Sequence, residues 1–174
     1  MQSEVLFIGG RSGVGKSSVA FELHAQLAAL NIKHCVIEGD SLDLAFPQPW
    51  EHHLAERNLA AIWANYRDLG YRRMIYTNTV SVRFTKELAA AMGDEPSITA
   101  VLLTATDETS SDRLRGRIQG CDFQEHLDRS VAAARELGLR TPRWVHRYPT
   151  DNRSVQAIAA GLLPLTGWTA NPAD

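Results

Sequence analysis

The sequence predicts an α/β fold in which a five-stranded parallel sheet lies between two layers of helices. Short apolar runs alternate with longer segments of helical periodicity along the 174 residues, a pattern typical of repeated β-α units. A glycine-rich turn joins the first apolar run to the first helical segment, as in folds that bind phosphate at the start of a helix. Together the two observations favour a nucleotide-binding α/β domain.

Each predicted strand is short, and most are rich in Val, Ile and Leu, as buried parallel strands are. The five strands are expected at residues 4–8, 33–38, 72–76, 98–103 and 144–148. Between them, apolar residues recur at helical spacing, for example Leu23, Leu27 and Leu30. The same spacing recurs over residues 59–69, where we interpret Trp63 as a core residue. These stripes indicate helices with one face on the sheet.

Composition narrows the classes of partner. With 44% hydrophobic and 22% charged residues, the chain has the composition and length of one globular domain, residues 1–174. The net charge of -2 supplies no basic field for nucleic acid. No apolar run approaches the roughly 18 residues that span a bilayer, so we expect no membrane partner and a cytoplasmic location. Cys35 and Cys121 have no metal-ligand spacing. Whether the chain is a monomer or a homodimer stays open.

Residues 10–17 match the phosphate-loop pattern G-x-x-x-x-G-K-[ST], placed between an apolar strand and an amphipathic helix. Glycines let successive backbone N–H groups turn inward around a phosphate, and the helix adds the positive end of its dipole. We expect Lys16 to reach the β and γ phosphates and Ser17 to bind Mg²⁺, so ATP and Mg²⁺ are the predicted cofactors. The nucleotide-binding residues of this segment are Gly10, Arg11, Ser12, Gly13, Val14, Gly15, Lys16, Ser17 and Ser18.

Some residues of the phosphate loop have alternative interpretations. Arg11 and Ser12 could equally form a solvated loop, and Ser18 could serve only as a cap or a contact to an α phosphate. Neither the guanine-reading pattern N/T-K-x-D nor the pattern D-x-x-G occurs in the sequence, which argues against a switch GTPase.

Three further segments resemble small-molecule kinases of the P-loop class. Residues 36–42, V-I-E-G-D-S-L, resemble the D-G-D element of adenylylsulfate kinases and the acidic site of chloramphenicol phosphotransferases, with Glu38 in place of the first Asp. Residues 102–108 followed by R-L-R-G-R at 113–117 are similar to the stretch by which gluconate kinases and nucleoside monophosphate kinases enter their lid. The H-F that gluconate kinases place after these arginines is missing. Residues 149–155, P-T-D-N-R-S-V, resemble the loop that borders adenine.

This resemblance implies a three-layer α/β/α P-loop NTPase fold with strand order 2-3-1-4-5 and a short helical lid at about residues 113–138. The implied activity is ATP-dependent transfer of phosphate to a hydroxyl of a small molecule, either a metabolite or an antibiotic. The resemblance also implies further nucleotide contacts from Arg115, Thr150, Asp151 and Arg153.

Asp40 follows the second predicted strand, at the edge of a parallel sheet where ligands bind. We expect its carboxylate to accept the proton of the acceptor hydroxyl, or to hold a water on Mg²⁺. The alternative is a cap for the turn at residues 41–45. Arg113 and Arg117 lie four residues apart on one helical face, so both could reach the γ phosphate during transfer. Their alternative is a salt-bridged surface.

Three residues are candidates for binding the acceptor. Asn78 follows the third predicted strand, and Arg83 could supply a cation for an anionic acceptor, or simply begin a surface helix. Trp50 lies in the proline-containing loop 46–53 and could form a wall of the acceptor site, or pack in the core. A different function is also open, namely a nucleotide-binding module that hydrolyses ATP slowly and serves a partner or a sensing role. Only a kinase would be accelerated by an acceptor.

Overall fold

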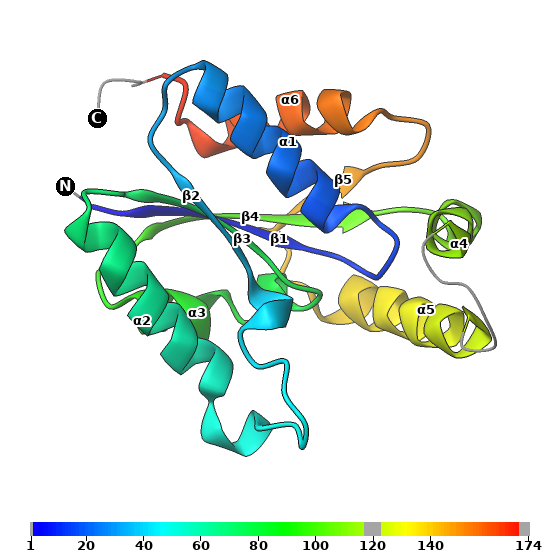
Figure 1. Cartoon of the computed structure of the whole chain (residues 1–174). Coiled ribbons are helices and arrows are strands. Elements are labelled where there is room, and N and C mark those ends of the chain that lie inside the picture. Colours follow the sequence, from blue (N-terminus) through cyan, green and yellow to red (C-terminus); the bar gives the residue numbers. More distant parts are fainter. Residues whose placement is uncertain (1, 117–122, 171–174) are drawn as a thin grey trace.

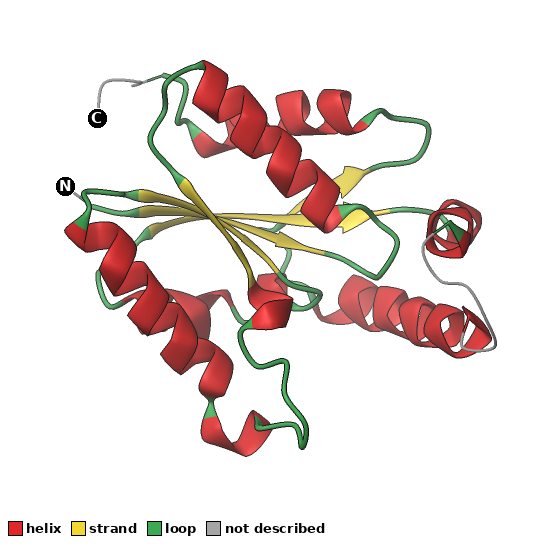
Figure 2. Ribbon diagram, viewed as in Figure 1, coloured by secondary structure: helices red, strands yellow, loops and turns green. Residues whose placement is uncertain are grey.

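The computed structural model describes residues 2–116 and 123–170 and shows alternating strands and helices (Figures 1 and 2). The strands and helices are β1 (Glu4–Gly9), α1 (Lys16–Ala29), β2 (Cys35–Glu38), α2 (Leu54–Asp68), β3 (Arg73–Thr77), α3 (Thr85–Met92), β4 (Ser97–Thr104), α4 (Asp107–Arg115), α5 (Phe123–Arg140), β5 (His146–Pro149) and α6 (Val155–Thr166). Short 3₁₀ helices follow β2 (η1, Gly39–Ser41), precede α2 (η2, Trp50–His52) and follow β3 (η3, Ser81–Arg83).

The five strands form one parallel sheet in the order β2-β3-β1-β4-β5, which confirms the expected order. The central strand is β1, where Phe7 pairs with Tyr76 of β3 and with Ala100 of β4. All five strands therefore have their carboxyl ends at the same edge, the right-hand edge in Figure 1. The loop to α1 and the segment to α4 leave the sheet at this edge.

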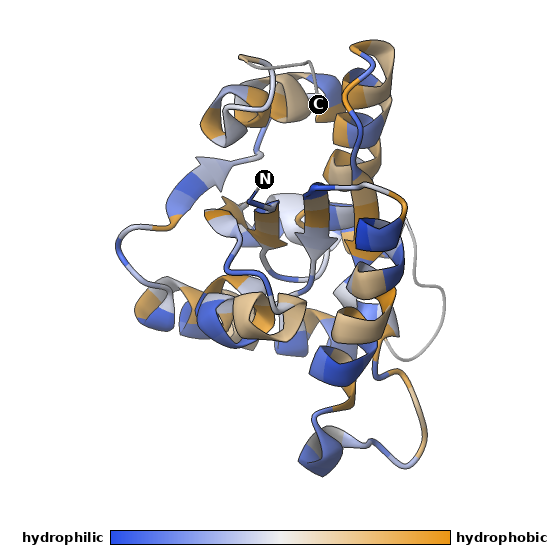
Figure 3. Cartoon of the chain, turned by 90° about the vertical axis from the view of Figure 1, so that its left-hand side faces the viewer, coloured by the Kyte–Doolittle hydropathy of each residue, from blue (hydrophilic) through white to orange (hydrophobic). Residues whose placement is uncertain are grey.

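Helices cover both faces of the sheet, and β1 shows why. Its alternate side chains point to opposite faces, so Val5 and Phe7 join the core cluster under α2, α3 and α5. Leu6 and Ile8 join the cluster under α1 and α6. Figure 3 shows hydrophobic and hydrophilic residues alternating along the helices, as expected for helices with one face on a sheet. The three-layer arrangement confirms the expected fold class.

Two expected strand starts were wrong by two residues, while the other boundaries agree to within one residue. Strand β2 begins at Cys35 rather than at residue 33, because the preceding residues complete the turn after α1. In that turn the Ile32 N–H donates to Leu27 O at 2.9 Å, and the His34 Nδ1 donates to Ile32 O at 2.7 Å. Strand β5 begins at His146 rather than at residue 144, because the Val145 N–H donates to Pro142 O in a turn.

None of the helices within residues 2–116 and 123–170 combines the length and the apolar character needed to cross a bilayer. The expected lid corresponds to the end of α4 and most of α5. Residues 117–122, which include Arg117, lie outside the described residues.

Candidate active site

The loop between β1 and α1 is wound tightly against β4 and α4. Gly10, Gly13 and Gly15 have φ angles of 146°, 84° and 101°, values that favour glycine. A Cβ on Gly13 would lie 2.6 Å from Ser110 O, and a Cβ on Gly10 would lie 2.7 Å from Leu103 O. The glycines at positions 10 and 13 are therefore required by both conformation and space.

The first turn of α1 faces this loop, and no side chain caps the start of the helix. Its N-cap residue, Gly15, provides no side-chain hydrogen bond, and the turn contains no acidic residue. The N–H groups of this turn and the positive end of the helix dipole are therefore suited to an anion. Lys16 Nζ donates to Gly10 O at 2.9 Å and lies 3.5 Å from Thr79 Oγ1, so its ammonium group is held beside the loop.

A hollow of about 230 Å³ lies at this turn. Lys16 and Ser17 from α1 line it together with Asp40 from η1. The remaining lining residues are Ser12, Gly13, Gly15 and Leu114. The volume is below the ~300 to 1,000 Å³ typical of complete small-molecule pockets, as expected for a site that holds only phosphate groups. The structure thus brings together Lys16, Ser17 and Asp40, three of the residues to which the sequence assigned chemistry.

Asp40 is anchored from the neighbouring strand. Asn78 Nδ2 donates to Asp40 Oδ1 at 2.7 Å, and the Val80 N–H donates to Asn78 Oδ1 at 2.9 Å. Both ends of the Asn78 amide are therefore used, which fixes its orientation. The N-cap residue of η1 is Glu38, which makes no side-chain capping bond. The hydrogen bond of Asp40 thus joins η1 to the segment after β3 and does not cap a turn.

The residues around this hollow fit Mg²⁺. Magnesium prefers oxygen ligands and usually retains waters, and Ser17 and Asp40 place a hydroxyl and a carboxylate at the same hollow. Within the described part of the chain, no three His, Cys, Asp or Glu side chains gather as a metal site. Ser17 would therefore hold the ion together with phosphate oxygens and water.

Arg11 is buried, at 3% exposure, so the solvated-loop interpretation of this residue was wrong. Its guanidinium group donates to the carboxylate of Asp107, and its Nε donates to Ser130 Oγ at 2.9 Å. The Ser130 hydroxyl in turn donates to Ser12 O at 2.8 Å. Arg11 therefore ties the phosphate loop to α4 and α5, while Ser12 is exposed. Ser18 is half-buried and follows Ser17 in the first turn of α1.

Arg113 also supports the loop. Its guanidinium group donates to Val14 O at 3.1 Å, to Thr150 Oγ1 at 3.0 Å and to Thr150 O at 3.0 Å. Thr150 is fully buried. These bonds occupy donors that the sequence analysis assigned to the γ phosphate, and Thr150 contacts Arg113 at the position expected to border adenine.

The segment after β5 is tied to the start of α4 through Asp151. Its Oδ1 accepts hydrogen bonds from the Thr106 N–H at 2.9 Å and from the Thr106 hydroxyl at 3.0 Å. The backbone bond from Thr106 is the main reason that the pKa of Asp151 lies below its ordinary value. Arg153 is exposed and lies over the ring of Tyr148, 5.4 Å from its centroid.

The remaining sequence candidates are dispersed. Arg115 is exposed, 3.8 Å from Asp112, which matches a salt-bridged helix face. Arg83 donates to Glu136 Oε1 at 2.8 Å, so its charge is already balanced. Trp50 lies in η2, and its side chain is not part of the described structure.

Sequence reasoning missed several supporting residues. Thr79 lies near Lys16, while Asp107 and Ser130 bind Arg11. Thr106 caps α4 by accepting from the Thr109 N–H at 3.2 Å. Only Thr106 had a local signal, because Thr before two acids is a typical helix start.

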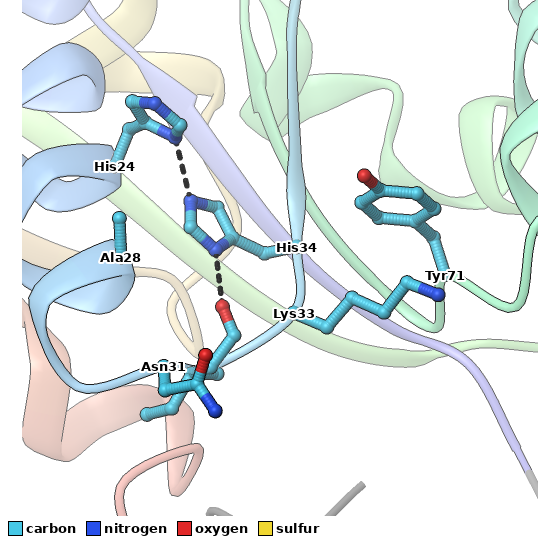
Figure 4. A pocket seen from close by; sticks show the side chains of 7 residues that line it. His24, Ala28, Asn31, Lys33, His34 and Tyr71 are labelled. Atoms are coloured by element: carbon cyan, nitrogen blue, oxygen red, sulfur yellow. Dashed lines mark hydrogen bonds between the residues drawn. The ribbon is translucent and has the colours of Figure 1, made fainter.

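A larger hollow, about 490 Å³, lies at the opposite edge of the sheet, before β2 and β3 (Figure 4). His24 Nδ1 lies 2.9 Å from His34 Nε2 there. Because His34 Nδ1 donates to Ile32 O, His34 Nε2 accepts and His24 donates in the neutral pair. Ligands of parallel α/β sheets bind at the carboxyl ends of the strands, so this hollow is remote from the phosphate loop.

Comparisons with known proteins agree with this geometry. The family model of adenylylsulphate kinase matches residues 2–61. No curated protein sequence matches the chain. The tunicamycin resistance protein of Deinococcus radiodurans has a similar structure, with 20% identity, a TM-score of 0.60 and coverage of 95% of this chain and 96% of that one.

Two further solved structures are similar over nearly the whole chain. The Mycobacterium tuberculosis APS kinase, solved with AMPPNP and APS, is 19% identical, with a TM-score of 0.60 and coverage of 94% of this chain and 97% of that one. A sugar kinase from Janibacter sp. HTCC2649 is 15% identical, with a TM-score of 0.65 and coverage of 99% of both chains. The chain therefore has the fold of the P-loop kinase-like superfamily.

Proposed function

We propose that the chain is an ATP-dependent phosphotransferase that phosphorylates a hydroxyl of a small molecule. The observation that carries this proposal is the hollow shared by Lys16, Ser17 and Asp40. A phosphate loop alone would serve a slow ATPase equally well. A carboxylate held beside that loop from a neighbouring strand is what transfer to an alcohol requires.

Each residue has a defined task in this reaction. The loop N–H groups and Lys16 bind the phosphates, and Ser17 helps to hold Mg²⁺, which neutralises phosphate charge when bound. Asp40 accepts the proton as the acceptor oxygen bonds to the γ phosphorus, and the bond to the β-γ bridging oxygen breaks with its electron pair leaving on ADP. Arg11 and Arg113 are positioning residues, because their bonds go to the protein around the loop.

Similarity to kinases supports the reaction class. The adenylylsulphate kinase family model spans the phosphate loop and Asp40, and the similar solved structures include an APS kinase, a gluconokinase and a shikimate kinase. We also propose that the end of α4 and α5 form a lid.

The test is acceptor-dependent turnover. Purified protein is incubated with Mg²⁺ and ATP, with and without a broad panel of alcohols, nucleosides and antibiotics, and ADP and phosphorylated product are measured. We expect at least one compound to accelerate ADP formation and to be recovered as a phosphate ester. Equal ADP formation throughout the panel, with nucleotide binding intact, would instead support the slow ATPase.

A further inference from the structure

A smaller hollow, of about 140 Å³, lies beside the phosphate site on its β3 side, and we call it the second hollow. Asn78 lines this hollow and donates to Asp40, which lines the phosphate hollow. The two hollows are therefore joined by one hydrogen-bonded pair of side chains. An acceptor in the second hollow would extend its hydroxyl past Asn78 toward Asp40.

The walls of this second hollow carry negative charge. Asp43 and Glu56 line it, and the described residues that line it include no Lys or Arg. The nearest candidate cation along the chain, Arg83, pairs with Glu136 of α5 at 2.8 Å. The exposed ring of His53 lies 3.9 Å from Glu56 and would offset its charge only when protonated. An anionic acceptor would therefore meet like charge from Asp43 and Glu56, while the guanidinium group of Arg83 is already paired with Glu136.

Tyr76 supplies a polar group to this hollow. It lines the same hollow at 2% exposure, and among the described residues its hydroxyl forms no hydrogen bond with the protein. Its hydroxyl packs against Gly39, where a Cβ would lie only 2.2 Å away. The Tyr76 hydroxyl is therefore available to form a hydrogen bond with a polar atom of a ligand in this hollow.

The electrostatics at Tyr76 agree with the charge of the walls. Burial raises the pKa of the Tyr76 hydroxyl above its ordinary value, and the carboxylates of Asp40, Asp43 and Glu56 raise it further. The negative charges of all three carboxylates therefore reach the Tyr76 hydroxyl. The exposed ring of Phe84, which also lines the hollow, has the guanidinium carbon of Arg83 5.5 Å from its centroid, so it adds apolar surface rather than a free site for a cation.

We infer that the acceptor is a hydroxyl compound that carries an ammonium group, such as an amino sugar, an amino alcohol or an aminoglycoside. This inference rests on the proposed function. The ammonium group would lie between Asp43 and Glu56, and the Tyr76 hydroxyl would bond a polar atom of the acceptor. The hollow is small enough that it admits one ring or a short chain, with the rest of a larger acceptor outside.

The test uses matched acceptors. Glucosamine, serinol and kanamycin are each compared with their N-acetylated derivatives, and glucose is compared with gluconate, by the kcat/KM of ATP-dependent phosphorylation. We expect the amine form of at least one pair to exceed its acetylated form by tenfold or more, and gluconate to be the poorest substrate.

Three variants locate the effect. Glu56→Gln and Asp43→Asn should each lower kcat/KM for the amine by about tenfold and leave the acetylated form within twofold. Glu87→Gln, an exposed residue of α3 that does not line the hollow, changes net charge equally and should have no effect. Thermal unfolding of each variant verifies the fold. Having both acid variants protects the test against the failure of one to fold.

The outcomes separate the two proposals. Phosphorylation of neutral or anionic compounds without preference for the amine would overturn the inference and leave the proposed function intact. Retention of the amine preference in both acid variants would also overturn it. If no compound of any charge is phosphorylated, both fail.

Discussion

The side-chain amide of Asn78 donates a 2.7 Å hydrogen bond to Oδ1 of Asp40, and this bond joins the end of β3 to η1. Asp40 and Asn78 follow strands β2 and β3, which are neighbours in the sheet, and the two residues are 38 positions apart in sequence. The bond leaves the second carboxylate oxygen of Asp40 available to a proton or a metal-bound water.

Asp40→Asn should retain nucleotide binding and lose phosphoryl transfer by roughly 10² to 10⁴-fold, because the amide cannot accept the proton. Asn78→Ala should lower kcat by a smaller factor, about tenfold, since the carboxylate remains but loses its anchor. Transfer and Mg-ATP affinity are measured separately for both variants. Full transfer in Asp40→Asn would remove Asp40 from the catalytic role.

Gly13→Ala should abolish Mg-ATP binding, because the added Cβ would lie 2.6 Å from Ser110 O at a φ of +84°. Gly138→Ala is the matched control, with no atom within 4 Å of the added Cβ. The control should stabilise the protein by about 0.5 to 1 kcal/mol, since alanine is the better helix former. Calorimetric titration and thermal unfolding compare the two. Normal affinity in Gly13→Ala would show that the loop tolerates a shift.

Arg113→Met should destabilise the protein by about 1 to 3 kcal/mol, because buried acceptors of Val14 and Thr150 lose their donor. The exposed Arg115→Met should stay within about 0.5 kcal/mol of wild type. Urea unfolding measures both. If Arg113→Met is as stable as wild type but lacks transfer, Arg113 acts on the phosphate directly.

Stability should fall on mild acidification because of His34. Burial lowers the pKa of His34 below its ordinary value of 6.5, so the unfolded chain takes up a proton at a pH where the folded chain does not. The full contribution to stability is present above pH 6.5 and is lost as the pH falls toward the lowered pKa. His34→Gln should therefore show a shallower decrease in unfolding free energy between about pH 7 and 5 than wild type. The exposed His146→Gln is the control, and an unchanged slope in His34→Gln would refute this account.

Local patterns explain why most of the fold could be predicted from the sequence. Buried parallel strands are apolar on both faces, so runs such as residues 4–8 are visible without neighbours. The phosphate loop can be recognised because its glycines are required by local backbone angles, which depend on only a few neighbouring residues. Strand order came from the family resemblance, since spacing along the chain does not reveal which strands pair.

The supporting residues could not be predicted because their partners are distant. Arg113 and Val14 are 99 positions apart, and Arg11 and Ser130 are 119 apart. Helical spacing shows that Arg113 and Arg117 share a face, but it does not show what that face meets. For the same reason, buried Arg11 was indistinguishable from a solvated loop residue.

The central claim is that the loop at the start of α1 binds a triphosphate with Mg²⁺. Isothermal titration of Mg-ATP into wild type and Lys16→Ala tests it most directly, with thermal unfolding to verify that the variant is folded. We predict saturable one-to-one binding by wild type and a loss of affinity of at least tenfold in Lys16→Ala. Absence of heat and of thermal stabilisation in wild type, or equal affinity in the two proteins, would contradict the account.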